Sequence, residues 1–237
     1  MSEKPIVGIT MGDPAGNGPE ITVKALSRSD IYDRCRPIVI GDAKMIEQAA
    51  GFVNRPDIKI HRCEQVSDAL FTCGTIDVLH MELIADVKKF PIGEVSVEGG
   101  NAAFQCVRKV IELAIDGEVD ATCTNALNKE AMNKALEYYH GEKSDGYTHF
   151  DGHTEIYATY TKTKKYTMML VHHDLRVVHV STHVSLREAC DRVRKDRVLD
   201  VIRIADQACK DMGIKNPKVG VSGLNPHCGE NGLFGTE

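Results

Sequence analysis

The sequence predicts a layered α/β fold with a largely parallel sheet. Short runs of β-branched residues alternate along the chain with longer segments of helical periodicity, and glycine-rich turns separate them. The chain has 237 residues, of which 42% are hydrophobic and 27% charged, with a net charge of −5. This composition is typical of a globular protein with a substantial core. It excludes disordered and collagen-like proteins.

The strands and helices follow from these patterns. Buried strands are expected over residues 5–10, 37–41, 119–124, 166–172, 176–181 and 218–222. The clearest helix is expected over 98–115, because small and aliphatic residues recur there at spacings of three and four, and Asp116-Gly117 ends it. A second long helix is expected over 186–212, ending at Gly213. Ligand sites in such folds lie at the carboxyl ends of the strands.

Composition also limits the compartment and the partners. The N-terminus lacks the apolar core of a signal peptide, and no segment approaches the roughly 18 apolar residues of a membrane span. We therefore expect a cytoplasmic protein without a membrane partner. Eight cysteines occur at irregular spacings with no C-x-x-C pair, and most of them are expected to be reduced thiols in the core or on the surface. The mild acidity and the absence of a basic block argue against nucleic acid, which leaves a small-molecule enzyme as the default.

Two regions differ from this regular pattern. Residues 138–151 are polar and glycine-punctuated, and are expected to form a flexible insertion or lid. The chain ends at GLFGTE, directly after a glycine-rich loop and without a closing helix or strand. From this ending we expect that a C-terminal portion is absent.

Two strand-to-helix turns are candidate binding sites. Residues 12–20 (GDPAGNGPE) form a glycine-rich turn that can hold a phosphate with backbone N–H groups, or can simply be a tight turn that needs glycine. Residues 122–130 (TCTNALNKE) gather hydroxyls, amides and a lysine, as suits an anionic ligand. The alternative is that Thr124 or Asn125 only caps the following helix and Lys129 is solvated.

Three histidines adjoin expected strand ends. They are His153 in GHTE, His183 in STH and His227 in NPHCGE. Neutral imidazoles gathered at strand ends can bind a divalent metal, and His153 can also donate to a phosphate or carboxylate. Each histidine alone is more often structural than a ligand, and the other seven, His61 among them, are expected to be structural or surface residues.

Together, GDPAGNGPE, TNALNKE, GHTE, STH and GLNPHCGENGLFG, in this order, resemble the PdxA family of NAD-dependent 4-phosphohydroxythreonine dehydrogenases. The resemblance covers essentially the whole chain. It implies a three-layer α/β/α fold similar to isocitrate and isopropylmalate dehydrogenases, built from two interleaved subdomains, with the C-terminal part absent here. It also implies a homodimer whose active sites lie between subunits. On this reading, residues 1–237 are an incomplete catalytic unit.

The resemblance implies roles for individual residues. His153 and Thr154 are expected to bind the phosphorylated substrate, and His183 and His227 to be two of three ligands to a divalent metal ion (Zn, Co, Mn, Ni or Mg). The family's third metal histidine lies in a later Tyr-His-Asp-Gln-Gly-like segment that does not occur before Glu237. The sequence contains no glycine-rich dinucleotide fingerprint, so it does not indicate which residues contact NAD. It also does not identify a catalytic residue.

The implied reaction is NAD-dependent oxidation of a secondary alcohol, followed by loss of carbon dioxide. The expected substrate is 4-phosphohydroxy-L-threonine, or D-threonate or D-erythronate 4-phosphate; the ENGLFG ending resembles the second branch. An alternative is a truncated, non-catalytic relative that binds phosphorylated ligands or a partner chain. A weaker alternative is an acyltransferase acting on phosphate.

Overall fold

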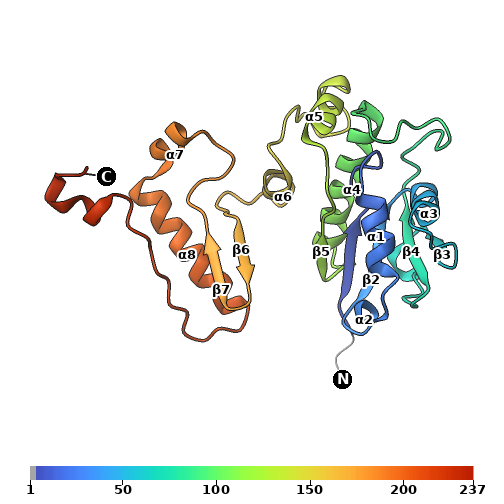
Figure 1. Ribbon diagram of the computed structural model, residues 1–237, viewed down its shortest axis with the longest axis horizontal. Helices are drawn as coiled ribbons and strands as arrows, with labels where there is room; N and C mark the ends of the chain where they lie inside the picture. Colours follow the sequence, from blue (N-terminus) through green and yellow to red (C-terminus); the bar gives the residue numbers. More distant parts are fainter. Residues whose placement is uncertain (1–3, 237) are drawn as a thin grey trace. The chain divides into compact units, whose positions relative to one another are not determined.

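The protein consists of two compact units in a computed structural model that describes residues 4–236. The first unit extends to Thr161 and the second begins at Lys162. Figure 1 shows a parallel sheet with its helices in the first unit, and a smaller sheet with helices in the second. No helix within residues 4–236 is long and apolar enough to cross a membrane.

The sheet of the first unit has five parallel strands in the order β3-β4-β2-β1-β5. The strands are β1 (Ile6–Thr10), β2 (Arg36–Gly41), β3 (Lys59–Cys63), β4 (Thr75–His80) and β5 (Ala121–Cys123). The three strands expected in this unit are confirmed as β1, β2 and β5. The sequence did not predict β3, an edge strand that reads KIHRC, or β4, which carries Asp77 inside its apolar run.

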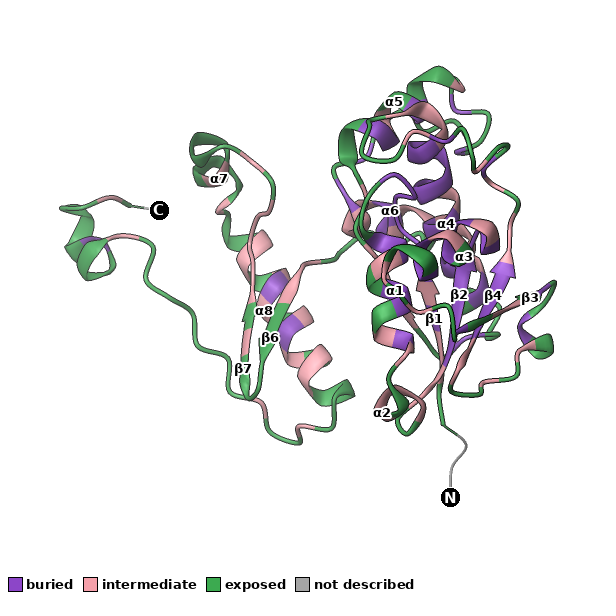
Figure 2. Cartoon of the chain, turned by 45° about the vertical axis from the view of Figure 1, so that its right-hand side comes forward, coloured by how far each residue is buried: buried purple, intermediate pink, exposed green. Residues whose placement is uncertain are grey.

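Helices cover both faces of this sheet. Helices α1 (Gly18–Leu26) and α3 (Ala43–Phe52) pack with Val39 and Val78 on one face. Helix α4 (Val97–Ile115) packs with Ile38 and Ile40 on the other. Because successive strand residues point to opposite faces, β2 supplies both layers. The structure thus confirms the expected layered arrangement, and Figure 2 shows buried residues concentrated along these elements.

The remaining helices of the unit extend the layer formed by α4. Helices α5 (Lys129–Tyr138) and α6 (His153–Tyr160) pack on α4 through a cluster that includes Phe104, Met132 and Ile156. Two short elements, α2 (Ser29–Tyr32) and the 3-10 turn η1 (Val66–Asp68), lie in the connections between strands. The side chain of Ser96 caps the start of helix α4, and the helix ends before Gly117, as the sequence predicted.

The segment 138–151 contacts the helices around it through a few polar and aromatic residues. The carbonyl of Lys143 accepts hydrogen bonds from Gln105 and Arg108 of α4, at 2.9 and 2.8 Å. Phe150 is buried, and its ring stacks at 5.9 Å from that of Phe104. The side chain of Asn133 bonds both the N–H and the carbonyl of Phe150. These contacts hold parts of the segment against α4 and α5, and its expected role as a flexible insertion or lid stays a prediction.

The second unit contains β6 (Met169–His172), β7 (Leu175–Val178), α7 (Leu186–Arg192), α8 (Lys195–Asp211) and the 3-10 segment η2 (Pro226–Gly232). The two expected strands form, but they pair antiparallel through a two-residue turn, which parallel strands cannot use. The expected long helix is two helices, because Val193 and Arg194 adopt non-helical backbone angles.

The strand expected at residues 218–222 is not formed. Val219 and Val221 are exposed, and the segment pairs with no strand of the described chain. In this unit, helix α8 contributes Val201 and Ala205 to the buried hydrophobic residues. A β-branched run becomes a strand only when another strand accepts its hydrogen bonds, so the composition of this segment misled the prediction.

Candidate functional site

The two predicted turns lie side by side at the carboxyl end of the sheet. They follow β1 and β5, which are neighbouring parallel strands. The backbone N–H of Asp13 donates to the carbonyl of Ala126 at 2.9 Å, and the N–H of Asn125 donates to the hydroxyl of Thr10 at 2.9 Å. Residues more than a hundred positions apart thus form one surface at the carboxyl end of the sheet. Ligands bind at this end in open α/β folds.

Asn125 holds these turns together and does not cap a helix. Its side-chain amide donates to the carbonyl of Gly18 at 3.1 Å and to the hydroxyl of Thr22 at 2.7 Å, both in α1. The cap of α5 is Asn128, whose side chain accepts from the N–H of Ala131 at 3.0 Å. The alternative that Thr124 or Asn125 caps this helix is therefore wrong.

The glycines of the first turn are required by close packing. Gly12 has a φ of 78°, and a Cβ on it would lie 2.5 Å from the carbonyl oxygen of Ala126. A Cβ on Gly18 would lie 2.4 Å from the carbonyl oxygen of Met11. The tight-turn interpretation of these two residues is therefore confirmed.

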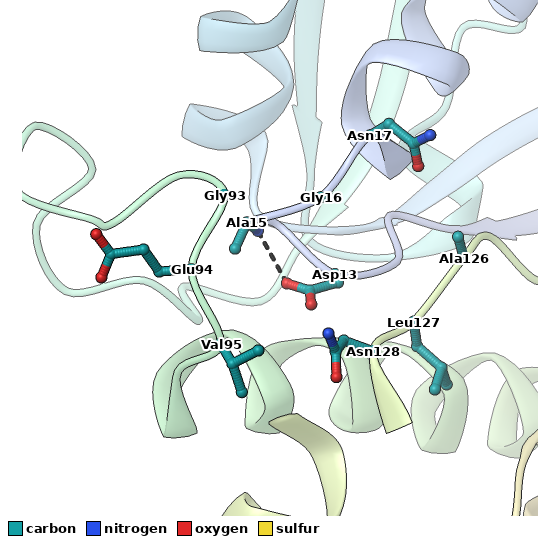
Figure 3. Close-up of a pocket in the computed structure, with 10 residues that line it drawn as sticks. All are labelled: Asp13, Ala15, Gly16, Asn17, Gly93, Glu94, Val95, Ala126, Leu127 and Asn128. Atoms are coloured by element: carbon teal, nitrogen blue, oxygen red, sulfur yellow. Dashed lines mark hydrogen bonds between the residues drawn. The ribbon is translucent and has the colours of Figure 1, made fainter. Parts of the chain in front are cut away.

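The same turns also line a cavity of about 310 Å³. Figure 3 shows its lining, with the side chains of Asp13 and Asn128 close together. The lining residues are Asp13, Ala15, Gly16, Asn17, Gly93, Glu94, Val95, Ala126, Leu127 and Asn128. The Asp13 carboxylate accepts from the N–H of Ala15 at 2.9 Å. Burial raises the pKa of Asp13, and backbone hydrogen bonds from Ala15 and Asn128 oppose that rise.

A second group of polar side chains lies where α5 and α6 begin. Lys129 is the first residue of α5 and is exposed. Gly152 precedes α6, and a Cβ on it would lie 3.6 Å from Cε and 3.8 Å from Nζ of Lys129. It would also lie 3.7 Å from Oε2 of Glu155. The ammonium group therefore lies beside the first turn of α6, which contains His153 and Thr154.

His153 presents an unpaired nitrogen at this place. Its Nε2 is buried and has no hydrogen-bond partner among the described residues. Burial lowers the pKa of His153, the positive charge of Lys129 lowers it further, and a backbone hydrogen bond to Asn125 opposes both effects. Glu155 Oε2 is likewise buried without a partner. Buried polar atoms are nearly always hydrogen-bonded, so this pair indicates a place for a ligand or ordered water.

Helix α6 is tied to the strand end. The hydroxyl of Tyr157 donates to that of Thr122 in β5 at 2.7 Å. Asn125, two residues beyond the strand, is bonded in turn to α1. The first turn of α6 therefore has a defined position relative to both predicted turns, and His153 lies close to the backbone of one of them.

His183 and His227 lie in the second unit, in irregular segments. Both are exposed and have left-handed backbone angles, with φ values of 54° and 50°. The ring of His227 lies 5.8 Å from that of Phe234. Within residues 4–236, neither histidine belongs to a group of three side chains placed to share a metal ion. Their role as metal ligands stays a prediction.

The structure also shows a cluster that the sequence reading missed. His61, Cys63 and Asp77 offer ligand atoms that all lie within 4.8 Å of one another. The pattern His-x-Cys on a strand was the available signal, and it was lost because β3 was not predicted. All eight cysteines are free in the structure, where most were expected to be.

Comparison with known proteins places the chain in a family. The family described as "Pyridoxal phosphate biosynthetic protein PdxA" matches residues 33–237. A protein of Clostridium botulinum strain Hall, named "Putative D-threonate 4-phosphate dehydrogenase", is 44% identical over 237 residues, which are 100% of this chain and 67% of that protein. A protein of the same name from Oceanobacillus iheyensis is 46% identical over 241 residues, covering 99% of this chain and 67% of its own length.

Solved structures agree with this placement. A 4-hydroxythreonine-4-phosphate dehydrogenase from Burkholderia phymatum superposes with a TM-score of 0.81 at 42% identity, covering 99% of this chain and 67% of that one. The Klebsiella pneumoniae enzyme of that name superposes with a TM-score of 0.85 at 35% identity, covering 98% of this chain and 68% of that one. This chain thus spans about two thirds of the length of these relatives. It belongs to the PdxA family of dehydrogenases, with the α/β fold of the isocitrate and isopropylmalate dehydrogenases.

Proposed function

We propose that this protein oxidises a phosphorylated hydroxy acid with NAD and that the product then loses carbon dioxide. The observation that carries the proposal is the buried, unpaired Nε2 of His153 beside Lys129, at the first turn of α6. In this proposal His153 and Thr154 bind the phosphate of the substrate. The family placement supports the dehydrogenase activity.

The proposed phosphate site combines three sources of positive potential. The first-turn N–H groups of α5 and α6 lack intrahelical partners, and the helix dipole favours an anion there. Lys129 adds a full positive charge next to Gly152. Burial and then Lys129 lower the pKa of His153, which favours its neutral form, whereas a dianionic phosphate against Nε2 would favour its protonated form. A bound phosphate is thereby stabilised by backbone, lysine and imidazolium together.

The metal site proposed for this function uses His183 and His227. Both rings are exposed, and neither makes a hydrogen bond to another residue of the described part of the chain, so their nitrogens are free to coordinate. Imidazole nitrogens suit zinc, cobalt, nickel or manganese. Two donors are fewer than the three protein ligands usual at a catalytic site, so this pair supplies part of a coordination shell. A divalent ion there would favour loss of the hydroxyl proton and stabilise the enolate left by decarboxylation.

The candidate substrates share the phosphate and differ in one substituent, which is an amino group in 4-phosphohydroxy-L-threonine and a hydroxyl in D-threonate and D-erythronate 4-phosphate. The relatives from C. botulinum and O. iheyensis carry the name of a D-threonate 4-phosphate dehydrogenase, whereas the solved structures carry that of a 4-hydroxythreonine-4-phosphate dehydrogenase. We therefore propose the shared class, a hydroxy acid 4-phosphate, as the substrate. We also propose a homodimer with shared active sites. Analytical ultracentrifugation tests whether the protein is a dimer.

Calorimetric titration with D-erythronate 4-phosphate, D-threonate 4-phosphate and 4-phosphohydroxy-L-threonine tests the phosphate site. We expect binding of at least one phosphorylated ligand, none of its unphosphorylated counterpart, and loss of about 10-fold or more in affinity in His153→Gln. The matched control is His172→Gln, because His172 is exposed and lies in the second unit. Equal binding with and without the phosphate group would refute the proposal. Binding with no NADH formation under any metal condition would favour the non-catalytic alternative.

A further inference from the structure

Three potential metal ligands meet at the β3 edge of the sheet in the first unit. His61 and Cys63 are two residues apart on β3, so their side chains point to the same face. Asp77 on β4 lies directly opposite His61 in the strand register. His61 Nδ1 lies 2.8 Å from Asp77 Oδ1 and 3.5 Å from Cys63 Sγ. The strand pairing itself therefore brings an imidazole, a thiol and a carboxylate together.

The carboxylate of this group is fixed and shielded from water. The Asp77 side chain is 0% exposed. Its Oδ1 accepts from the N–H of Leu70 at 3.1 Å and its Oδ2 from the N–H of Phe71 at 2.8 Å. These bonds orient the carboxylate as outer hydrogen bonds orient ligands in metal sites. They also leave the carboxylate free to accept from further groups.

Cys63 provides a soft sulfur ligand, and His61 lies where the group is open to solvent. Cys63 is buried, at 1% exposure, on the same side as Asp77. The His61 side chain is 34% exposed, so a small ion has a path into the group and water can complete its shell. Arg62, between them, points to the other face and pairs with Glu47 of α3 at 3.4 Å. No cation side chain of the described chain is paired with this thiol or carboxylate other than His61.

We infer that His61, Cys63 and Asp77 form a binding site for a thiophilic divalent cation, for which zinc is the best match. A tetrahedral zinc ion with bonds of about 2.0–2.3 Å places its donor atoms about 3.3–3.8 Å apart. The His61–Cys63 distance already has this value, and the His61–Asp77 distance reaches it with a shift of about half an ångström. The donor set of one nitrogen, one sulfur and one oxygen suits zinc more than magnesium or calcium. The site lies in the first unit, whereas His183 and His227 lie in the second.

Titration of the protein with Co²⁺ tests this inference. A thiolate bound to cobalt gives an intense near-ultraviolet charge-transfer band that histidine and carboxylate ligands do not give. We expect this band in the wild-type protein, its displacement by Zn²⁺, and its loss in Cys63→Ser. Cys73→Ser is the matched control, because Cys73 is an exposed cysteine of the same unit and is expected to leave the band unchanged. The double variant His183→Ala/His227→Ala should also keep it.

A wild-type protein that shows no band, or a band that persists in folded Cys63→Ser, overturns the inference. If Cys63→Ser does not fold, His61→Gln decides the question, since His61 is partly exposed and circular dichroism can check its fold. This variant should bind Co²⁺ at least about 10-fold more weakly than the wild type. Unchanged affinity in His61→Gln means that the His61–Asp77 pair only joins two strands.

Discussion

The side-chain amide of Asn125 donates a hydrogen bond to the hydroxyl of Thr22 at 2.7 Å, which joins the turn after β5 to helix α1. The hydroxyl of Thr22 donates in turn to the carbonyl of Gly18 at 3.0 Å. Because Tyr157 fastens α6 to the same strand end, these bonds position the proposed phosphate site relative to the sheet. The geometry of the site therefore depends on these hydrogen bonds together.

Replacing Asn125 should destabilise the first unit. Asn125→Ala removes two hydrogen bonds and leaves the carbonyl of Gly18 without this donor, which should lower the free energy of unfolding by about 1–3 kcal/mol. Urea denaturation measures the change. The control is Asn216→Ala at an exposed asparagine, expected to change stability by less than about 0.5 kcal/mol. Equal stability of the two variants would show that the amide bonds do not hold the turns.

The close packing of α4 on α5 should make one helical glycine irreplaceable. A Cβ on Gly100 would lie 2.0 Å from the carbonyl oxygen of Ala131, so Gly100→Ala must push the helices apart. We expect a loss of about 3 kcal/mol. Gly51→Ala in α3 meets no atom within 4 Å and should be neutral or stabilising by up to about 1 kcal/mol. Thermal unfolding of both variants tests this, and similar midpoints would contradict the packing described here.

Binding of a phosphorylated ligand should be linked to proton uptake at His153. The free imidazole has its pKa below the ordinary value of 6.5, because of burial first and Lys129 second, and a bound phosphate raises it. The contribution of His153 to affinity is therefore complete below the lowered pKa of the free protein. It is lost as pH rises through the pKa of the complex.

Calorimetry on wild type and His153→Gln at the same series of pH values measures this linkage, since titration of the phosphate itself is common to both. Their affinity ratio should be largest at acid pH and fall towards neutral pH. A second variant, Lys129→Met, should raise the pKa of His153 in nuclear magnetic resonance titrations. A ratio independent of pH would exclude a role for the imidazolium.

Loss of either predicted metal ligand should lower the metal content by the ion held at this pair and remove the activity as well. His183→Ala and His227→Ala each leave one imidazole of the pair, too few to retain a divalent ion. Atomic emission analysis of the purified variants, alongside NADH formation, checks the outcome. His173→Ala is the control, since His173 is an exposed histidine of the same unit with a similar left-handed φ of 49°. Variants that keep both metal and turnover would disprove the assignment.

The elements with strong local patterns were predictable from the sequence. Helix α4 shows a regular apolar stripe between Ser96 and Gly117, and β1 and β2 are continuous apolar runs, so local physics determines them. Strands β3 and β4 were missed because an edge strand carries polar residues and because Asp77 interrupts an apolar run. The opposite error occurred at residues 218–222. Their composition favours a strand, but no strand of the described chain pairs with them.

The candidate site was predictable in its parts but not in its assembly. The sequence singled out His153 and the turn that contains Lys129, yet only folding shows that they meet at Gly152. The alternative that Thr124 or Asn125 caps a helix considers local contacts only, whereas the partners of the Asn125 side chain lie more than a hundred residues away. Cross-strand pairs such as His61 and Asp77 depend on register, which the sequence does not specify.

The most direct test of the central claim is NADH formation by the protein. Each hydroxy acid 4-phosphate is offered beside its unphosphorylated form, with and without divalent metal, to wild type and His153→Gln. The account predicts metal-dependent NADH formation from a phosphorylated substrate only, reduced by about 10-fold or more in the variant. Equal turnover of the unphosphorylated acid, or full activity of His153→Gln, would contradict it.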